Sequence, residues 1–547
     1  MKKLLLTLFI STLLATFVYS QPTDTLSGDI TSTVTLNPSK KYLLFGEVKV
    51  KQGGAIVIPA GTIIYGHKPS KGSLIIERGG IINAIGTPTN PIIFTSAFPP
   101  GQKNAGDWGG VVILGRARIN TTTGADTAAI EGFANPIYFG GQNDDDSSGV
   151  MKYVRIEYAG IALSPNNEIN GLTLGGVGRK TVIEYIMVSY GGDDSFEWFG
   201  GTVNCKYLIS FNGIDDDFDT DNGYRGNVQF GLAIRSPLIA DVSGSNGFES
   251  DNNGAPNYNT PRTQATFSNM TIIGPKQYDT TTVNPNFKRG LHLRRNSLQN
   301  IYNTVFMGWP TGILFDGVGV AKGCLGDTIK LRSLVFAGIS GKNFDSTGTS
   351  TTGFNPTGFM LTPAFLNDTL NQNSEVQLTN PYGGFNNNNW QTSMFIPLPN
   401  SLLLNPARVT NVHNIDPYFD YVMFRGAFGI TDWGAGWANF RPDTVNYNTV
   451  GISQISSQVP SSFKLDQNYP NPFNPSTVIK FSITKPEFVS LSIYDITGRK
   501  VEQLVNAKLE VGTYEYRFDA SLLSSGIYFY RLEAGNFVET KKMMFIK

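Results

Sequence analysis

Acidic side chains crowd the central part of the chain, and their spacing suggests where chemistry can take place. Between residues 144 and 251 there are 17 Asp and Glu against 7 Lys and Arg, a local net charge of −10 in a chain that is neutral overall. Carboxylates held close together repel one another unless a cation, a basic side chain or a proton relieves them. The clusters are residues 144–146, 193–194 with Glu197, 215–217 with Asp219 and Asp221, and Glu249 with Asp251.

A calcium site is the first interpretation of these clusters. From residue 217 to residue 221 the carboxylates alternate with other side chains, which predicts that Asp217, Asp219 and Asp221 point to one face of a strand. Hard carboxylate oxygens suit Ca²⁺, although the run lacks the glycine and glutamate of an EF-hand loop. The predicted metal ligands are Asp215, Asp217, Asp219 and Asp221.

Acid–base catalysis is the second interpretation, because a pair of carboxylates can supply the general acid and base that cleave a glycosidic bond. The Gly-His-Gly and Arg-x-Lys motifs of pectin-degrading enzymes are missing from the sequence. The candidate catalytic residues are Asp193, Asp194, Asp215, Asp216, His292 and Arg294. In the third interpretation the carboxylates are solvated turn residues that hydrogen-bond to the nearby backbone. The sequence leaves all three interpretations open.

The elements that would position these side chains repeat along the chain. Residues 153–160 line up with residues 185–192, 32 positions on, and with residues 207–213, 22 further on. The pattern returns at residues 267–274, 301–308 and 331–338, and residues 56–64 match residues 74–82 with an offset of 18. Asp193 and Asp215 also stand 22 positions apart, so aligned coils would stack their loops about 4.8 Å apart.

Short β runs with glycine corners and no amphipathic helix between them indicate a solenoid, in which each coil buries its apolar side against its neighbours. We therefore expect an all-β fold, a right-handed parallel β-helix, with a β-propeller as the alternative. The body is predicted to span residues 21–450, with an irregular C-terminal cap from about residue 341. Residues 451–462, rich in Ser and Gln, are predicted to be a linker.

Both ends of the chain carry signals of another kind. Two lysines, an apolar run over residues 4–18 and small residues before position 21 predict a secretory signal peptide at residues 1–20. At the C-terminus, six runs with period-two patterning predict a small antiparallel β-sandwich over residues 463–547. The expected strands are 477–483, 488–494, 500–504, 512–518, 526–532 and 537–545.

The C-terminal stretch resembles the type A sorting domain of the type IX (Por) secretion system. The segments that carry the resemblance are residues 467–475 (QNYPNPFNP), 491–501, 512–514, 522–530 and the pair Lys541 and Lys542. The resemblance implies that residues 463–547 engage the type IX machinery and that the protein leaves the periplasm of a Gram-negative bacterium. It further implies release of the body or attachment to surface lipopolysaccharide.

The body resembles secreted and lipid-anchored β-helix proteins of Bacteroidota-like bacteria, through residues 107–115, 170–178, 192–202, 244–251 and 292–295. This resemblance implies a fold and an extracellular or cell-surface location, without a reaction. Because the chain is neutral, nucleic acid is not an expected partner. Cys205 and Cys324 are the only cysteines, and they form either a disulfide or two buried thiols.

We therefore predict an exported binding or structural module, with lipopolysaccharide or extracellular polysaccharide as candidate partners and Ca²⁺ as the candidate cofactor. The alternative is a polysaccharide lyase or glycoside hydrolase that uses the acidic clusters.

Overall fold

The computed structural model describes residues 24–546, apart from residues 165–166, 386–387, 446, 448–451, 457 and 521–522. The predicted signal peptide lies outside the described residues. The chain divides into two compact units, Met1–Val445 and Asn446–Lys547. No helix among the described residues is long and apolar enough to cross a membrane.

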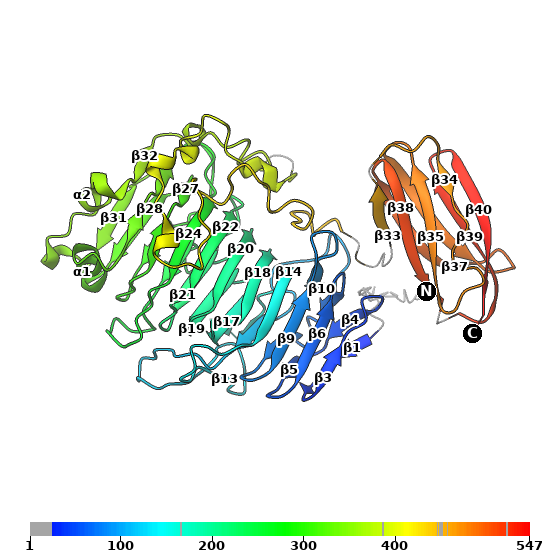
Figure 1. Ribbon diagram of the computed structural model, residues 1–547, viewed down its shortest axis with the longest axis horizontal. Helices are drawn as coiled ribbons and strands as arrows, with labels where there is room; N and C mark the ends of the chain where they lie inside the picture. Colours follow the sequence, from blue (N-terminus) through cyan, green and yellow to red (C-terminus); the bar gives the residue numbers. More distant parts are fainter. Residues whose placement is uncertain are drawn as a thin grey trace, which may run out of the picture. The chain divides into compact units, whose positions relative to one another are not determined.

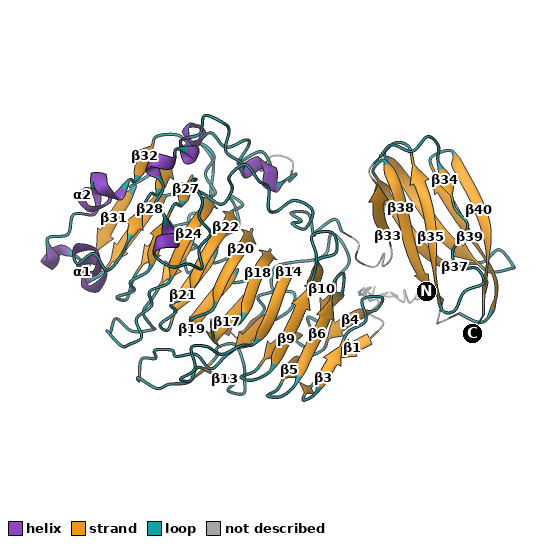
Figure 2. Cartoon of the chain, in the orientation of Figure 1, coloured by secondary structure: helices purple, strands orange, loops and turns teal. Residues whose placement is uncertain are grey.

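Within the described residues, the first unit contains two long parallel sheets that run side by side along a solenoid, as Figures 1 and 2 show. We call the larger one sheet A and the smaller one sheet B. Sheet A is made of β1 (Asp24–Leu26), β3 (Thr33–Thr35), β4 (Lys41–Leu44), β6 (Ala55–Pro59), β7 (Ile63–Gly66), β9 (Ile81–Ile85), β10 (Ile92–Ser96), β14 (Gly149–Glu157), β18 (Val182–Ser189), β20 (Asn204–Phe211), β22 (Asn227–Ile234), β24 (Thr266–Ile273), β26 (Asn300–Tyr302), β27 (Val305–Met307), β29 (Leu331–Arg332), β30 (Val335–Ala337) and β32 (Asp368–Leu370).

Sheet B is made of β2 (Asp29–Ile30), β5 (Glu47–Val50), β8 (Ser73–Ile76), β11 (Gly110–Leu114), β17 (Leu172–Val177), β19 (Phe196–Gly201), β21 (Phe218–Asp221), β23 (Phe248–Ser250), β25 (Arg289–Leu293), β28 (Thr311–Asp316) and β31 (Phe344–Thr347). Two small hairpins join β12 (Ala128–Ala129) to β13 (Tyr138–Phe139) and β15 (Ala162–Ser164) to β16 (Asn167–Glu168). The α-helices are α1 (Val318–Leu325) and α2 (Pro356–Met360). The predicted parallel β-helix is therefore confirmed.

The core of the solenoid is a stack of like side chains from successive coils. In sheet B, Phe196, Phe218 and Phe248 occupy one register position, and their ring centroids lie 5.6 and 5.2 Å apart. Their neighbours in each strand point outward, because successive side chains of a strand alternate between faces. The outward positions of sheet B are where the central carboxylates lie.

Long strands of sheet A bend at one residue with a left-handed backbone. Tyr153, Tyr185 and Tyr207 have φ values of 52°, 56° and 60°, which are uncommon for residues other than glycine. The three rings stack with centroids 4.3 Å apart at each step. Each strand thereby turns a corner and continues in the same sheet.

The register confirms two of the predicted offsets and corrects the third. Ile186 pairs with Val154 in the coil before it and with Leu208 in the coil after it, as the repeats from residue 153 onward predict. Near the N-terminus, however, Ile56 pairs with Ile82 rather than with Leu74, so the coil there is longer than the predicted offset. The two apolar runs look alike because both face the core. Residues 56–64 lie in β6 and β7 of sheet A, whereas residues 74–82 begin in β8 of sheet B and end in β9 of sheet A.

The described residues of the predicted cap, 341–450, cover the end of the solenoid only in part: Phe354 and Met360 pack on the core there. β31 and β32 still belong to the coils. From residue 373 onward the chain runs back over the outer face of sheet A, where Trp390, Phe428 and Trp437 pack against side chains of sheet A. We call residues 373–443 the cover segment. It contains the short 3-10 helices η3 (Asn373–Val376), η4 (Thr392–Phe395), η5 (Leu402–Leu404), η6 (Pro406–Arg408) and η7 (Val412–Asn414).

The second unit is a sandwich of two antiparallel sheets, and all six predicted strands are present within a few residues of the expected bounds. One sheet holds β33 (Ile452–Ser456), β38 (Gly512–Asp519), β35 (Ser476–Ile483) and β34 (Lys464–Leu465). The other holds β37 (Lys500–Leu509), β36 (Glu487–Tyr494), β39 (Gly526–Ala534) and β40 (Phe537–Phe545). The linker prediction for residues 451–462 is wrong at residues 452–456, because β33 pairs with β38.

Both cysteines are buried free thiols: Cys205 in β20 and Cys324 in α1. Two buried thiols was one of the two expectations for this pair.

Candidate functional site

The outer face of sheet B carries three rows of polar side chains that run from coil to coil. Row 1 lies just before the strands, row 2 lies within them, and row 3 lies at their ends. Row 1 contains Asn170, Asp194, Asp216 and Asn246; row 2 contains Glu197, Asp219, Glu249 and His292; row 3 contains Asp221, Asp251, Arg294 and Asp316. The coil register therefore brings together carboxylates that are well separated in the sequence.

Row 1 carboxylates accept hydrogen bonds from the backbone of the next coil. Asp194 Oδ1 accepts from the Asp216 amide at 2.7 Å, and Asp216 Oδ1 accepts from the Asn246 amide at 2.5 Å. Asn246 Nδ2 also donates to Asp216 Oδ2 at 3.3 Å. Part of the acidic cluster thus forms hydrogen bonds that tie coil corners together, as the turn interpretation expected.

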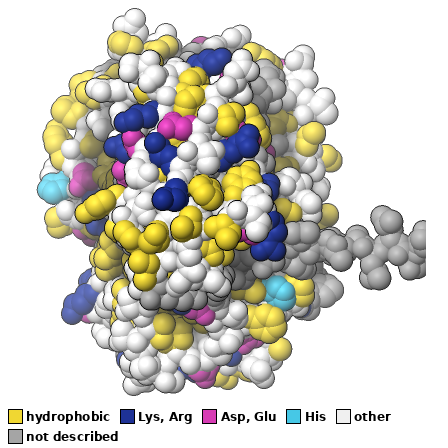
Figure 3. Space-filling model, turned by 90° about the vertical axis from the view of Figure 1, so that its right-hand side faces the viewer, with side chains coloured by type: hydrophobic (Ala, Val, Ile, Leu, Met, Phe, Trp, Pro, Cys, Tyr) yellow, Lys and Arg dark blue, Asp and Glu magenta, His cyan; other side chains and the backbone are white. Residues whose placement is uncertain are grey.

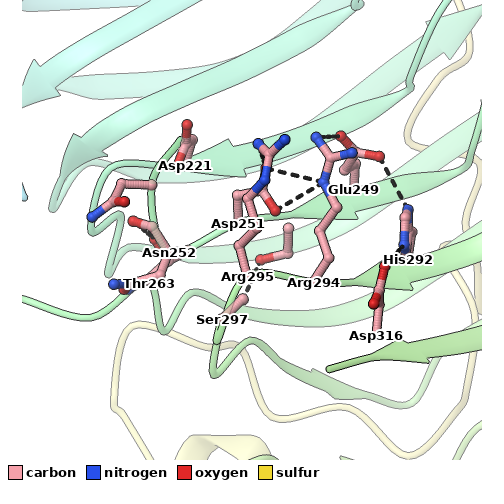
Figure 4. Close-up of polar contacts among 12 residues, drawn as sticks. Asp221, Glu249, Asp251, Asn252, Thr263, His292, Arg294, Arg295, Ser297 and Asp316 are labelled. Atoms are coloured by element: carbon pink, nitrogen blue, oxygen red, sulfur yellow. Dashed lines mark hydrogen bonds and ion pairs between the residues drawn. The ribbon is translucent and has the colours of Figure 1, made fainter. Parts of the chain in front are cut away.

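Arginine and histidine neutralise the carboxylates at the other end of the rows (Figure 4). Arg294 Nε donates to Asp251 at 2.9 Å, and Arg294 also pairs with Glu249. His292 lies between two carboxylates, with Nδ1 3.2 Å from Glu249 and Nε2 3.3 Å from Asp316. This end is a network of ion pairs in which every member has an oppositely charged neighbour.

The pKa values in this network follow the neighbouring charges. Burial opposes ionisation of Glu249, but the hydrogen bond from His292 and the charge of Arg294 outweigh it and lower the Glu249 pKa. Burial also disfavours the charged form of His292, yet its hydrogen bonds to Asp316 and Glu249 raise the His292 pKa. We infer a charged imidazolium held by two carboxylates.

Between these ends, Asp194, Glu197 and Asp219 lack a cationic partner among the described residues, although Asp194 accepts the backbone hydrogen bond from Asp216. Glu197 and Asp194 are only 7% and 8% exposed, and no described residue of opposite charge forms an ion pair with any of the three. Burial is the main cause that raises the pKa of each well above its usual value, and neighbouring carboxylates add to it. At neutral pH this trio needs either protons or a cation.

Two oxygens at this place are buried without a hydrogen-bond donor among the described residues. They are Asp219 Oδ1 and Asn170 Oδ1. The Asn170 side chain is only 1% exposed and reaches the trio, because its Nδ2 donates to Glu197 Oε2. Buried oxygens that lack a donor are costly unless something else satisfies them.

The distances within the cluster suit a metal ion. Carboxylate oxygens of Asp194, Glu197 and Asp219 lie within 4.8 Å of one another, and so do those of Asp193, Asp194 and Asp215. Carboxylate and amide oxygens are the donors that Ca²⁺ takes, at 2.3–2.6 Å from the ion. The donor set therefore fits calcium chemically.

The four predicted metal ligands do not gather at one place. Asp215 and Asp219 belong to the two carboxylate groups just described, while Asp221 lies in row 3, where burial and the charge of Asp251 raise its pKa to about 7. The structure corrects the prediction for Asp217. Its side chain is fully buried and forms an ion pair with Arg235 at 3.0 Å, so it does not point to the same face of the strand as Asp219. β21 begins only at Phe218, and the alternation fails at the corner before it.

The predicted catalytic residues separate into two groups. Asp193, Asp194, Asp215 and Asp216 lie together at the row 1 corners, whereas His292 and Arg294 contact Glu249 further along the solenoid. Asn170 was missed by the sequence analysis. The coil spacing could have identified Asn170, because it lies two positions before β17 just as Asp194 lies two positions before β19.

A pocket of about 400 Å³ opens beside row 3. Arg294, Arg295 and Asp316 line it together with Tyr258 and the start of α1. The trio of Asp194, Glu197 and Asp219 is not among its lining residues. The open pocket and the unrelieved carboxylates are therefore separate features.

Stacked parallel coils with ordered rows of polar side chains define a β-helix protein. Residues 28–392 match the family model described as pectate-lyase like beta helix domain, and the chain belongs to this family. Residues 467–547 match the secretion system C-terminal sorting domain. No match was found among curated proteins or among solved structures.

These matches establish where the protein acts. The sorting domain directs export by the type IX secretion machinery to the cell surface or extracellular space of a Bacteroidota-like Gram-negative bacterium. The protein is therefore a secreted β-helix protein whose C-terminal unit engages that machinery.

Proposed function

We propose that the body is a binding and structural module outside the cell and that Ca²⁺ bound between coils stabilises it. The ligands would be Asp194, Glu197 and Asp219, with the Asn170 amide oxygen beside them. The observation that supports this most is the buried, donor-less Asp219 Oδ1 within a trio of carboxylates that have no cationic partner among the described residues.

A cation at this place would join three successive coils. Asn170, Glu197 and Asp219 come from or adjoin β17, β19 and β21, which pair consecutively in sheet B. Extracellular calcium sites typically bind with dissociation constants of about 10⁻⁴–10⁻³ M. Such a site would be occupied after export, in a calcium-rich medium, and would be emptier before it.

Thermal unfolding of the exported chain in calcium and in chelator tests this proposal. A rise of the transition temperature in millimolar Ca²⁺, reversed by chelator, supports it, since a ligand that binds only the native state stabilises that state. An unchanged transition up to 10 mM Ca²⁺, roughly ten times the weak end of that range, contradicts it.

A lyase or hydrolase is the second candidate, because one observation favours it. Asp316 and Arg294 line an open pocket, and His292 contacts Asp316. Carboxylate, imidazole and guanidinium side chains near an open pocket are components of an acid–base site. A degradation screen on acidic and neutral polysaccharides, with His292→Ala as the comparison, decides between this candidate and a binding module.

A further inference from the structure

A second and larger groove lies at the N-terminal end of sheet B, away from the acidic rows. Its volume is about 620 Å³, within the range of 300–1,000 Å³ that is typical of small-molecule sites. It is lined by Lys49, Lys51, Gln52, Glu77, Arg78, Arg116, Asn135, Pro136, Ile137 and Tyr138. Four cationic side chains thus face one carboxylate, in a chain whose formal net charge is zero.

The two lysines are already engaged with carboxylates. Lys49 Nζ lies 2.5 Å from Glu47, and Lys51 Nζ lies 2.6 Å from Glu77. The arginines are different. Arg78 donates to the Gly140 carbonyl at 3.1 Å and Arg116 to the Arg78 carbonyl at 3.4 Å, and neither forms an ion pair with a described carboxylate.

A glycine corner brings Arg116 into this position. A Cβ added at Gly79 would lie 2.6 Å from Arg116 Nη2, so the guanidinium lies directly over the glycine of the preceding coil. Gly79 also has φ +84°, which a larger residue rarely adopts. Two guanidinium groups from adjacent coils are therefore presented at one corner without a described carboxylate to occupy them.

Another wall of the groove is lined by residues of the loop that carries β13. Tyr138 is 50% exposed and lines the groove beside Asn135. Exposed tyrosine provides a flat apolar surface with a polar tip, and an asparagine amide can both donate to and accept from hydroxyl groups. This wall suits a sugar ring, whereas the arginine wall suits an oxyanion bound through two parallel hydrogen bonds.

We propose that this groove binds a phosphorylated saccharide, with the phosphate on Arg78 and Arg116 and the sugar against Tyr138. The proposal rests on the binding role proposed above and names its ligand class. A phosphate dianion balances the surplus positive charge of the lining better than a single carboxylate does. Figure 3 shows a face on which basic, acidic and hydrophobic side chains are interspersed, without a large patch of one charge. The groove is distinguished by its two arginines, which have no described carboxylate partner.

Calorimetric titration of the exported chain with maltose 1-phosphate tests the proposal, with maltose, inorganic phosphate and a uronic acid disaccharide as comparisons. Maltose 1-phosphate is expected to bind at least about tenfold more tightly than maltose, and more weakly as salt rises. Arg78→Gln and Arg116→Gln should each weaken it by about tenfold or more. Tyr138→Ala should weaken it by about threefold without affecting inorganic phosphate.

Arg179→Gln is the matched control, because Arg179 is an exposed arginine of the same unit that pairs with Asp145 outside the groove. Absence of binding at 10 mM (roughly the weak limit for a small ligand), equal affinity for maltose, or unchanged affinity in both arginine variants overturns the proposal. Tighter binding of the uronic acid disaccharide overturns the choice of phosphate, and equal binding of inorganic phosphate overturns the saccharide. The calcium-dependent transition is measured on the same variants, so failure here is distinguishable from failure of the calcium site.

Discussion

Replacing Asp219 with asparagine should have opposite effects with and without calcium. In chelator, Asp219→Asn removes one of the carboxylates whose pKa values are raised by burial and by the charges of neighbouring carboxylates, so the variant should unfold at a higher temperature than the parent. In calcium, the same change removes a ligand, and the order should reverse. The side chains are nearly the same size, so packing changes little.

The rise of the transition temperature in calcium can be estimated from the free energy of calcium binding to the native state. Calcium at 100 times its dissociation constant stabilises the native state by about 2.7 kcal/mol. The entropy of unfolding of the first unit, for roughly 420 residues at about 2.1 cal/mol/K per residue, is about 0.9 kcal/mol/K. The parent should therefore gain about 3 °C. If the variant binds about 30-fold more weakly, the same calcium concentration raises its transition by only about 1 °C.

Differential scanning calorimetry of both proteins, in chelator and in a calcium series, measures these shifts. Asp145→Asn is the control, since Asp145 is a 59% exposed carboxylate outside the cluster, and it should follow the parent in both conditions. If Asp219→Asn keeps the full calcium shift, Asp219 is not a ligand. If the variant is less stable than the parent in chelator, the Asp219 carboxylate of the parent is not destabilised by burial and by its neighbouring carboxylates.

Three further predictions concern the rest of the body. Trp437→Ala should lower the free energy of unfolding by about 3–5 kcal/mol, because the Trp437 side chain is buried where the cover segment packs on sheet A. Limited proteolysis of the variant should then cut the cover segment first. Equal cleavage of parent and variant would contradict this. Arg235→Met should lower the free energy of unfolding, measured in denaturant, by about 3–5 kcal/mol, since it leaves Asp217 charged and buried. A smaller decrease would mean that Asp217 is protonated. The pKa of His292 is raised in the folded state, so its protonated form stabilises that state. This stabilisation is fully present below about pH 6.5 and is lost as pH rises through the folded-state pKa. His292→Gln should therefore flatten the decline of the transition temperature between about pH 6 and pH 8, and an unchanged decline would assign it to other groups.

The sequence was sufficient for features that depend on local pattern and repetition. Tyrosines and glycines recur coil by coil from residue 153 onward, and each coil must stack on the next to bury its apolar side. The six strands of the C-terminal unit follow from period-two alternation, and the QNYPNPFNP segment marked the sorting domain. The stacking of Asp193 and Asp215 was predicted from the same coil spacing, and their carboxylate oxygens lie within 4.8 Å of each other.

The sequence was insufficient where a residue's role depends on which coil corner it occupies. Asp217 and Asp219 are close neighbours in the chain, yet one turns inward to Arg235 and the other lies in an outward row, because β21 begins between them. The cover segment was taken for a cap, since nothing local records that apolar side chains on the outer face of sheet A must be buried by a distant part of the chain.

What the sequence by itself determined is a solenoid, its export signal and the concentration of carboxylates in the middle coils, since these are properties of composition and period. Only the tertiary structure decided which carboxylates accept hydrogen bonds from backbone amides, which pair with arginine or histidine, and which have no cationic partner among the described residues. That partition depends on distances of a few ångströms between side chains of different coils. Those distances are set by the coil register, which stays aligned in sheet B although loops of unequal length separate its strands in the sequence.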